Sequence, residues 1–210
     1  GIGPGSICTT RMVAGIGVPQ ISAIMDVRKA LNKKNIKIIS DGGIKFSGDI
    51  AKALAAGADA IMMGSIFAGT DESPGKKFKY KGKLYKQYRG MGSIGAMSSG
   101  SANRYFQKNF KDKSKFVPEG VEGRVIYKGS VSKIIYQLKG GLRSSMGYIG
   151  AKNLNQIIKN AEFIKITKAG FYESMVHSVE MTQKTINYKL WNLRYSLHFY
   201  FLFYQLTKSM

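Results

Sequence analysis

The chain has 210 residues, enough for one sizeable domain, and its 44% apolar and 21% charged residues are ordinary for a globular protein. A single cysteine excludes an internal disulfide framework and suits the cytoplasm, and no secretory signal or membrane span is predicted. The net charge of +21 suggests either a phosphate-bearing partner or lysines spread over solvated faces. The lysines are dispersed and lack the arginine–aromatic interleaving of an RNA platform, so nucleic acid is not expected as the main partner.

Helix and strand patterns alternate between residues 18 and 63. Apolar residues at helical spacing predict helices over 18–31 and 46–56. Short runs with β-branched residues predict strands over 36–40 and 58–63. Such alternation with short links is typical of an α/β fold with a parallel sheet, in which the chemistry gathers at the carboxyl ends of the strands.

Periodicity is lost from about residue 69 to residue 118, and an irregular stretch of this length predicts a lid or a binding loop. Within it, residues 79–85 favour a hairpin with Gly82 in its turn. Residues 130–140 predict a helix that ends at Gly140-Gly141, and a short helix over 154–160 and a strand over 163–166 follow. The apolar run 197–206 is too short to span a bilayer and is compatible with an interfacial anchor or a buried strand.

Cys8 lies in the run Gly3-Pro4-Gly5-Ser6-Ile7-Cys8-Thr9-Thr10-Arg11. Backbone N–H groups beside a helix start favour a thiolate, and Arg11 adds a positive charge, so Cys8 is a candidate nucleophile. The alternative is a small residue buried in a turn, which is the usual fate of a free cysteine.

This cysteine motif resembles the catalytic loop shared by IMP dehydrogenase and GMP reductase. Three further segments occur in the order of that family: Tyr88-Arg89-Gly90-Met91-Gly92-Ser93, Asn103-Arg104-Tyr105-Phe106 and Val117-Pro118-Glu119-Gly120-Val121-Glu122-Gly123. The first of these, together with Ser65 where GMP reductases generally have a second glycine, favours the IMP dehydrogenase branch. A GMP reductase-like enzyme remains an alternative.

The resemblance runs from Gly1 to about Tyr188 and implies an α/β fold that is the C-terminal part of a (β/α)8 TIM barrel with a long flap loop. It divides the chain into the barrel part (1–70), the flap and substrate loop (71–128), C-terminal helices and a tail segment (129–188), and an atypical apolar extension (189–210). The chain begins inside a motif, so we expect a piece of a longer protein. With the first barrel strands missing, an inactive remnant or a basic binding protein also stays open. The isolated chain is expected to aggregate or to stay partly unfolded, and to form no NADH from IMP.

The reaction implied by the resemblance is the NAD-dependent oxidation of IMP to XMP, a step of guanine nucleotide synthesis, through a covalent bond to Cys8. The implied catalytic residues are Cys8, Thr10, Arg104, Tyr105 and Glu119. The implied IMP-binding residues are Ser6, Asp41, Gly42, Gly43, Gly64, Ser65, Tyr88, Gly90, Met91, Gly92 and Glu119. Taken without the resemblance, each glycine could mark a plain turn, and Asp41 could form an Asx-turn.

For the nicotinamide the resemblance implies contacts with Gly1 and Gly3. It also implies a potassium ion, held by the backbone carbonyls of Gly3, Gly5 and Cys8 and by those of Glu173, Ser174 and Met175 from the neighbouring subunit of a homotetramer. Bacterial relatives usually have histidine where Met175 stands. Neither His177 nor His198 has a second metal-ligating side chain at suitable spacing, so no transition-metal site is expected.

Overall fold

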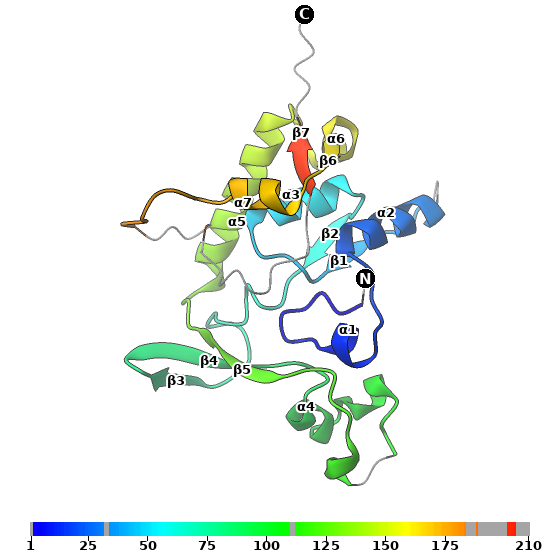
Figure 1. The fold of residues 1–210 in the computed structure, drawn as a ribbon, viewed down its shortest axis with the longest axis vertical. Helices are drawn as coiled ribbons and strands as arrows, with labels where there is room; N and C mark the ends of the chain where they lie inside the picture. Colours follow the sequence, from blue (N-terminus) through cyan, green and yellow to red (C-terminus); the bar gives the residue numbers. More distant parts are fainter. Residues whose placement is uncertain (1, 32–33, 110–111, 184–187, 189–200, 205–210) are drawn as a thin grey trace, which may run out of the picture. The chain divides into compact units, whose positions relative to one another are not determined.

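The computed structural model describes residues 2–31, 34–109, 112–183, 188 and 201–204 (Figure 1). The chain folds into two compact units, one made of Gly1–Val18 with Met63–Lys133 and the other of Pro19–Met62 with Ile134–Met210. We refer to them as the cysteine unit and the helical unit. The division of the sequence at residues 70, 128 and 188 stays a prediction.

The helical unit contains a parallel pair of strands with helices alternating along the chain. Strand β1 (Ile39–Asp41) pairs in parallel with β2 (Ala60–Met62), and helices α2 (Gln20–Leu31) and α3 (Ser47–Ala55) precede and separate them. The predicted α/β alternation is therefore confirmed, with strands shorter than predicted. The buried side chains of this region are mainly aliphatic: Ile21, Ile24, Ile38, Ile44, Ile50, Ala51, Ala53 and Leu54.

Asp59 joins the two strands at their beginning. Its Oδ2 accepts a hydrogen bond from the Ile38 N–H at 2.8 Å and pairs with the Arg28 guanidinium at 2.5 Å. The hydrogen bond from Ile38 and the nearby Arg28 hold the pKa of Asp59 below its ordinary value, although desolvation opposes them. Arg28 also donates from Nε to the Gly57 carbonyl at 2.8 Å, so one side chain fastens α2 to the turn before β2.

Helix α5 (Val131–Tyr148) runs through Gly140 and Gly141, so the predicted helix end at these glycines is wrong. The reason is packing between distant parts of the chain. A Cβ atom on Gly141 would lie 2.0 Å from Ser47 Oγ, so glycine here lets α5 approach the first turn of α3. A Cβ on Gly140 would meet nothing within 4 Å.

The rest of the helical unit follows α5. Helix α6 (Leu154–Asn160) has the predicted bounds, and β6 (Glu162–Lys165) lies where a strand is predicted. Helix α7 (Lys168–Glu173) has no counterpart among the predictions. Strand β7 (Phe201–Tyr204) pairs antiparallel with β6, which favours the strand alternative for the part of the apolar run that the structure describes.

The cysteine unit holds a short helix, α1 (Thr10–Val13), and a three-stranded antiparallel sheet of β3 (Lys77–Tyr80), β4 (Lys83–Arg89) and β5 (Glu122–Ile126). The predicted hairpin is confirmed and is longer than predicted. Lys81 and Gly82 turn it with φ of 46° and 76°, the pair of positive values that a tight hairpin turn needs.

The stretch predicted to be irregular also contains α4 (Ile94–Ser98) and two 3₁₀ turns, η1 (Ser101–Tyr105) and η2 (Lys113–Lys115). The prediction of an irregular region is therefore wrong in part. These elements have five residues or fewer, too few for a periodic apolar pattern. Across the portion of the chain that the structure describes, no helix is both long enough and apolar enough to cross a membrane.

Candidate functional site

The loop that carries Cys8 is closed by Arg11. The Arg11 guanidinium donates from Nε to the Ile2 carbonyl at 2.8 Å and from Nη2 to the Val18 carbonyl at 2.7 Å, so it ties together the two ends of the segment. Gly3 and Gly17 lie against the same side chain, since a Cβ atom on either would come within 2.7 Å of an Arg11 atom. The Arg11 guanidinium, expected from the sequence to favour the thiolate, is therefore hydrogen-bonded to backbone carbonyls, and these bonds hold the loop closed.

Cys8 is half-buried at the tip of this loop, directly before α1. Its thiol donates to Thr10 Oγ1 at 3.2 Å, and its backbone N–H donates to the Gly5 carbonyl at 3.1 Å. The placement beside a helix start is as predicted. A half-buried thiol bonded to a hydroxyl is more accessible than the fully buried packing residue of the alternative reading.

The cysteine loop is joined to the segment around Glu119 by backbone hydrogen bonds. The Thr9 N–H donates to the Glu119 carbonyl at 2.9 Å, and the Val121 N–H donates to the Ile7 carbonyl at 3.0 Å. Cys8 and Gly120 thus form an isolated antiparallel bridge. The structure places Glu119 one residue from the position opposite the thiol.

The Gly90–Gly92 turn packs onto this bridge. The Gly90 N–H donates to the Val121 carbonyl at 2.9 Å, and the Glu119 N–H donates to the Gly92 carbonyl at 3.0 Å. A Cβ on Gly90 would lie 3.1 Å from the Ile7 carbonyl oxygen, so a side chain would separate the two loops. Met91, between the two glycines, is 52% exposed, so its side chain is open to solvent.

Tyr105 completes the group around the thiol. A Cβ on Gly92 would lie 2.8 Å from Tyr105 Cζ and 3.0 Å from the Glu119 carbonyl carbon, which places the tyrosine ring against both segments. Burial raises the pKa of Tyr105, and the negative charges of Cys8 and Glu119 raise it further, whereas Arg104 lowers it. Cys8, Tyr105 and Glu119 are therefore near enough to interact electrostatically. The Arg104 side chain is exposed.

A turn at Gly64-Ser65, also in the cysteine unit, contains two of the predicted IMP-binding residues. The Gly64 carbonyl accepts from the Phe67 and Ala68 N–H groups, each at 3.0 Å. A Cβ on Gly64 would lie 3.2 Å from the Tyr88 hydroxyl oxygen, so Tyr88 reaches this turn from β4. Ser6 is exposed on the cysteine loop.

The helical unit holds three more of the predicted IMP-binding residues, Asp41, Gly42 and Gly43. Asp41 ends β1 with an exposed side chain, and the Gln20 side-chain amide donates to its carbonyl at 2.9 Å. Gly42 and Gly43 follow with φ of 87° and 81°, values that favour glycine. Among the residues that the structure describes, no N–H donates to the Asp41 carboxylate, so the Asx-turn alternative is not formed.

The predicted potassium ligands near residue 174 and the predicted nicotinamide contact at Gly1 do not belong to the group described around Cys8. Glu173, Ser174 and Met175 lie at the C-terminal end of α7, where the Ser174 and Met175 N–H groups donate back to Gly170 and Tyr172. Gly1 lies outside the described residues, as does His198. His177 is exposed beside Ser178, and the described parts of the chain contain no cluster of three His, Cys, Asp or Glu side chains able to hold a metal ion.

Several buried or half-buried polar side chains that the sequence does not single out hold these loops. Lys86 is 4% exposed, and its ammonium donates to the Thr70 carbonyl at 2.7 Å and to the Ser73 carbonyl. Gln107 is 8% exposed and binds the backbone of Val117. Lys128 donates to the Ile66 carbonyl at 2.6 Å. The sequence marks each of these residues merely as a polar residue close to a motif. Their partners are backbone groups far away in the sequence, so the contacts cannot be read from it.

Cys8, the Tyr105 ring and the Glu119 backbone thus lie together beside glycine-rich turns. Residues 1–177 match the family model described as the IMP dehydrogenase / GMP reductase domain, and the chain belongs to this family. The match confirms the resemblance drawn from the four motifs.

Three relatives show how much of such a protein this chain represents. It is 59% identical to an inosine-5'-monophosphate dehydrogenase of Chlorobaculum parvum over 90% of its own length and 38% of the relative's. The corresponding values are 59%, 90% and 39% for that of Helicobacter pylori, and 57%, 90% and 38% for that of Aquifex aeolicus. The chain therefore spans about two fifths of the length of these relatives.

Proposed function

We propose that this chain is the C-terminal part of the catalytic (β/α)8 barrel of an IMP dehydrogenase, which oxidises IMP to XMP with NAD. The parallel β1–β2 pair with its helices supports the barrel, because two neighbouring barrel strands would pair in this way. The family name also covers GMP reductase, but the three relatives above carry the name of the dehydrogenase. Residues 71–128 then act as the flap and substrate loop.

The observation that carries this proposal is the convergence of Cys8, Thr10, Tyr105 and Glu119 in one unit. The Cys8 sulfur forms a bond to carbon 2 of the hypoxanthine ring, and a hydride leaves from the same carbon. NAD, when bound, supplies the acceptor for that hydride. Water then attacks carbon 2, the bond to sulfur breaks, and XMP leaves. Splitting the reaction into two steps is what covalent catalysis offers.

The second step needs a group that removes a proton from water. Tyr105 with Arg104 forms one candidate route, and Thr10 with Glu119 forms the other. Glu119 lies in the segment hydrogen-bonded to the cysteine loop, and Thr10 accepts the hydrogen bond of the thiol. Hydrogen bonds therefore hold both residues close to Cys8. Because the pKa of Tyr105 is raised, its hydroxyl stays protonated at neutral pH and serves as a hydrogen-bond donor and acceptor to water.

Each IMP contact is assigned from the family motifs. The 5′-phosphate is assigned to Ser6, Gly43, Gly64, Ser65 and Tyr88. The two ribose hydroxyls are assigned to Asp41, whose exposed carboxylate can accept two hydrogen bonds, with Gly42 beside it. The Gly90-Met91-Gly92 backbone and Glu119 are assigned to the purine.

The chain's residues fit the two groups that this activity implies. Gly3 has φ of 81°, and a side chain there would strike Arg11, so this position of the cysteine loop needs glycine, and we assign its backbone to the nicotinamide. For potassium the proposed donors are carbonyl oxygens of Gly3, Gly5 and Cys8, which suit a hard cation. The carbonyls at the end of α7 around Glu173 to Met175 carry the partial negative charge of a helix C-terminus, and in a homotetramer a neighbouring subunit would supply them. The assembled enzyme would act in the cytoplasm.

The test is covalent capture of the purine in a full-length protein, made by placing this segment in the Chlorobaculum parvum relative. With IMP and NAD, mass spectrometry should find a purine adduct on the Cys8 peptide, and Cys8→Ser should abolish it. Met12→Ser is the matched control, since Met12 is 87% exposed in the same segment. An adduct that survives Cys8→Ser would remove Cys8 from the mechanism, and the absence of any IMP-dependent NADH would overturn the proposed function.

A further inference from the structure

The peptide group between Asp41 and Gly42, at the end of β1, is hydrogen-bonded through both of its polar groups. Its carbonyl, which belongs to Asp41, accepts from the Gln20 side-chain Nε2 at 2.9 Å. Its N–H, which belongs to Gly42, donates to the Met62 carbonyl at 3.2 Å. Because the C=O and the N–H of a trans peptide point in opposite directions, the two bonds fix the plane of this peptide from opposite sides. The backbone that carries the Asp41 side chain is thereby held in one orientation.

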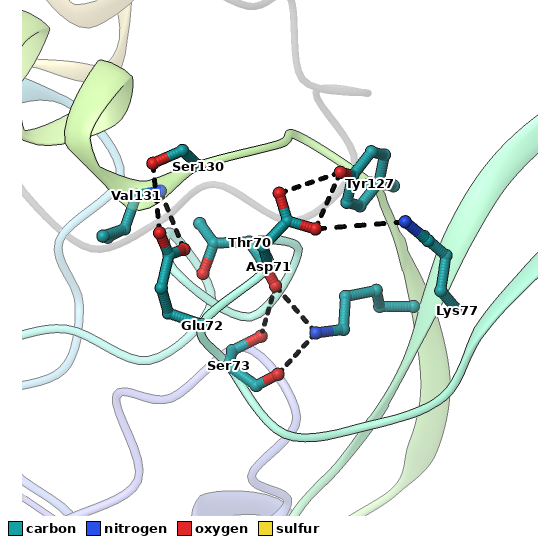
Figure 2. Close-up of polar contacts among 9 residues, drawn as sticks. Thr70, Asp71, Glu72, Ser73, Lys77, Tyr127, Ser130 and Val131 are labelled. Atoms are coloured by element: carbon teal, nitrogen blue, oxygen red, sulfur yellow. Dashed lines mark hydrogen bonds and ion pairs between the residues drawn. The ribbon is translucent and has the colours of Figure 1, made fainter.

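The Asp41 carboxylate depends on this backbone for its direction. Other exposed carboxylates of the chain are held directly, and Figure 2 shows Asp71, which accepts from the Tyr127 hydroxyl at 2.7 Å and 2.9 Å. Among the residues that the structure describes, no group donates a hydrogen bond to the Asp41 carboxylate. The placement of this carboxylate therefore follows from the peptide at the end of β1.

Gln20 buries an amide of which one polar atom is unpaired. The side chain is 5% exposed, and its Oε1 accepts no hydrogen bond from any group within the described ranges. Ser40, which precedes Asp41 on β1, is 1% exposed, and its Oγ is also unpaired among the described residues. Burial of an unpaired polar atom lowers stability. Both unpaired atoms belong to residues that adjoin Asp41, one through the chain and the other through a hydrogen bond.

Stability alone gives glutamine no advantage over an apolar side chain of the same size. Helix α2 already packs through Ile21 and Ile24, which are 2% and 4% exposed. Methionine at position 20 would fill the space of the glutamine without an unpaired oxygen, but it could not donate to the Asp41 carbonyl. Residues that depart from the rules of stable packing are expected where they serve a function. The bond to the Asp41 carbonyl is therefore the contribution that requires glutamine.

We propose that Gln20 is a positioning residue for Asp41 and thereby determines how strongly the ribose hydroxyls of the substrate are bound. Its Nε2 holds the last peptide of β1, and this peptide sets the direction of the carboxylate that accepts from the 2′- and 3′-hydroxyls. The inference rests on the proposed function, because it takes Asp41 as the ligand of the ribose. It adds a residue of α2 that acts on the substrate through Asp41.

The experiment compares IMP with 2′,3′-dideoxy-IMP, which lacks both ribose hydroxyls. Binding is measured by calorimetry in the full-length protein that carries this segment and Cys8→Ser, which prevents turnover. Gln20→Met should weaken IMP binding about tenfold, the effect of misaligned hydrogen bonds to a charged group, and should leave the dideoxy ligand within about twofold. Gln20→Leu, a second variant without the donor, should give the same pattern. Lys29→Met, at an exposed position of α2, is the matched control and should change neither ligand.

Two further measurements separate positioning from support of the fold. In an Asp41→Ala background, Gln20→Met should have no additional effect on IMP binding, because two residues that act through one carboxylate are not additive. The thermal unfolding midpoint of Gln20→Met should stay within about 2 °C of the unsubstituted protein. The reason is that the variant removes the unpaired Oε1 together with the bond to Asp41, and the two effects on stability oppose each other.

Unchanged IMP binding in Gln20→Met would remove this residue from the ribose site. Equal weakening of both ligands, or a midpoint that falls by several degrees, would mean that Gln20 supports the fold. Additive losses in the Asp41→Ala background would mean that it acts through another group. If the unsubstituted protein binds both ligands equally, the ribose hydroxyls are not recognised and the inference fails. The proposed function is judged separately, by IMP-dependent NADH formation in the protein with Cys8 intact.

Discussion

The side chain of Gln107 is hydrogen-bonded to the backbone of Val117 through both of its polar atoms. Nε2 donates to the Val117 carbonyl at 2.9 Å, and Oε1 accepts from the Val117 N–H at 2.8 Å. Gln107 follows Tyr105 by two residues, and Val117 precedes Glu119 by two. The pair therefore fixes the spacing between the two segments that provide the candidate routes for water activation.

Replacing Gln107 should loosen this connection. In Gln107→Leu the Val117 N–H and carbonyl lose their partner, at a cost of about 1–2 kcal/mol. Hydrogen–deuterium exchange at the Val117 amide should accelerate by about tenfold. The control is Gln87→Leu at an exposed position on β4, which should leave this amide unchanged. Equal protection of Val117 in both variants would contradict the role given to Gln107.

Arg104 should matter for the second chemical step alone. In the full-length protein, Arg104→Ala should leave the burst of NADH from the first turnover largely intact, since hydride transfer precedes water attack. Steady-state turnover should fall by roughly 100-fold, the typical contribution of a general base. Rapid-mixing absorbance at the NADH band separates the two phases. Lys108→Ala, at a nearby exposed lysine, is the control, and equal slowing of burst and steady state would rule out this division of labour.

The two adjacent glycines of α5 should respond in opposite directions to alanine. Gly141→Ala places a methyl group against Ser47 and should lower the free energy of unfolding by about 1–3 kcal/mol. Gly140→Ala adds its methyl group in open space inside a helix and should raise the free energy by about 0.5–1 kcal/mol. Urea unfolding midpoints measure both changes. Adding Ser47→Gly to Gly141→Ala should recover part of the loss, and its failure to do so would place the strain elsewhere.

Asp59 should make stability depend on pH in the acidic range. Its pKa in the folded chain lies below the ordinary 3.8, so its contribution is complete above pH 3.8 and is lost as the pH falls through the folded pKa. At pH 7, Asp59→Asn should lower the free energy of unfolding by about 1.5–3 kcal/mol, the range for hydrogen bonds to a charged group. The difference from the unsubstituted chain should shrink in this acidic window. Asp26→Asn, at an exposed position of α2, serves as control; a loss independent of pH would contradict the assignment.

The sequence predicts elements well where local signals and packing agree. Helix α6 begins after Asn153, whose side chain accepts from the Gln156 N–H at 3.2 Å, and its predicted bounds are the observed ones. Helix α5 is longer than predicted. Gly141 lies inside it to make room for Ser47, and this contact cannot be foreseen because the two residues are far apart in the sequence. Strand β5 forms by pairing with β4, which precedes it by more than 30 residues in the sequence. Its own five residues carry no pattern that distinguishes them from a loop.

The candidate site shows the same contrast. The motifs name Cys8, Thr10, Tyr105 and Glu119, and the structure gathers these four in one unit. The residues that hold them could not be inferred in advance. Lys86 and Lys128 are two of the many lysines in this chain, and only their distance to backbone carbonyls distinguishes them from exposed ones.

The bridge between Cys8 and Gly120 has a consequence for motion in this unit. Because the Thr9 and Val121 N–H groups bond the cysteine loop to the Glu119 segment on either side of the bridge, we expect the two segments to move together. Cys8 is then expected to keep its distance from the Glu119 backbone when neighbouring segments move.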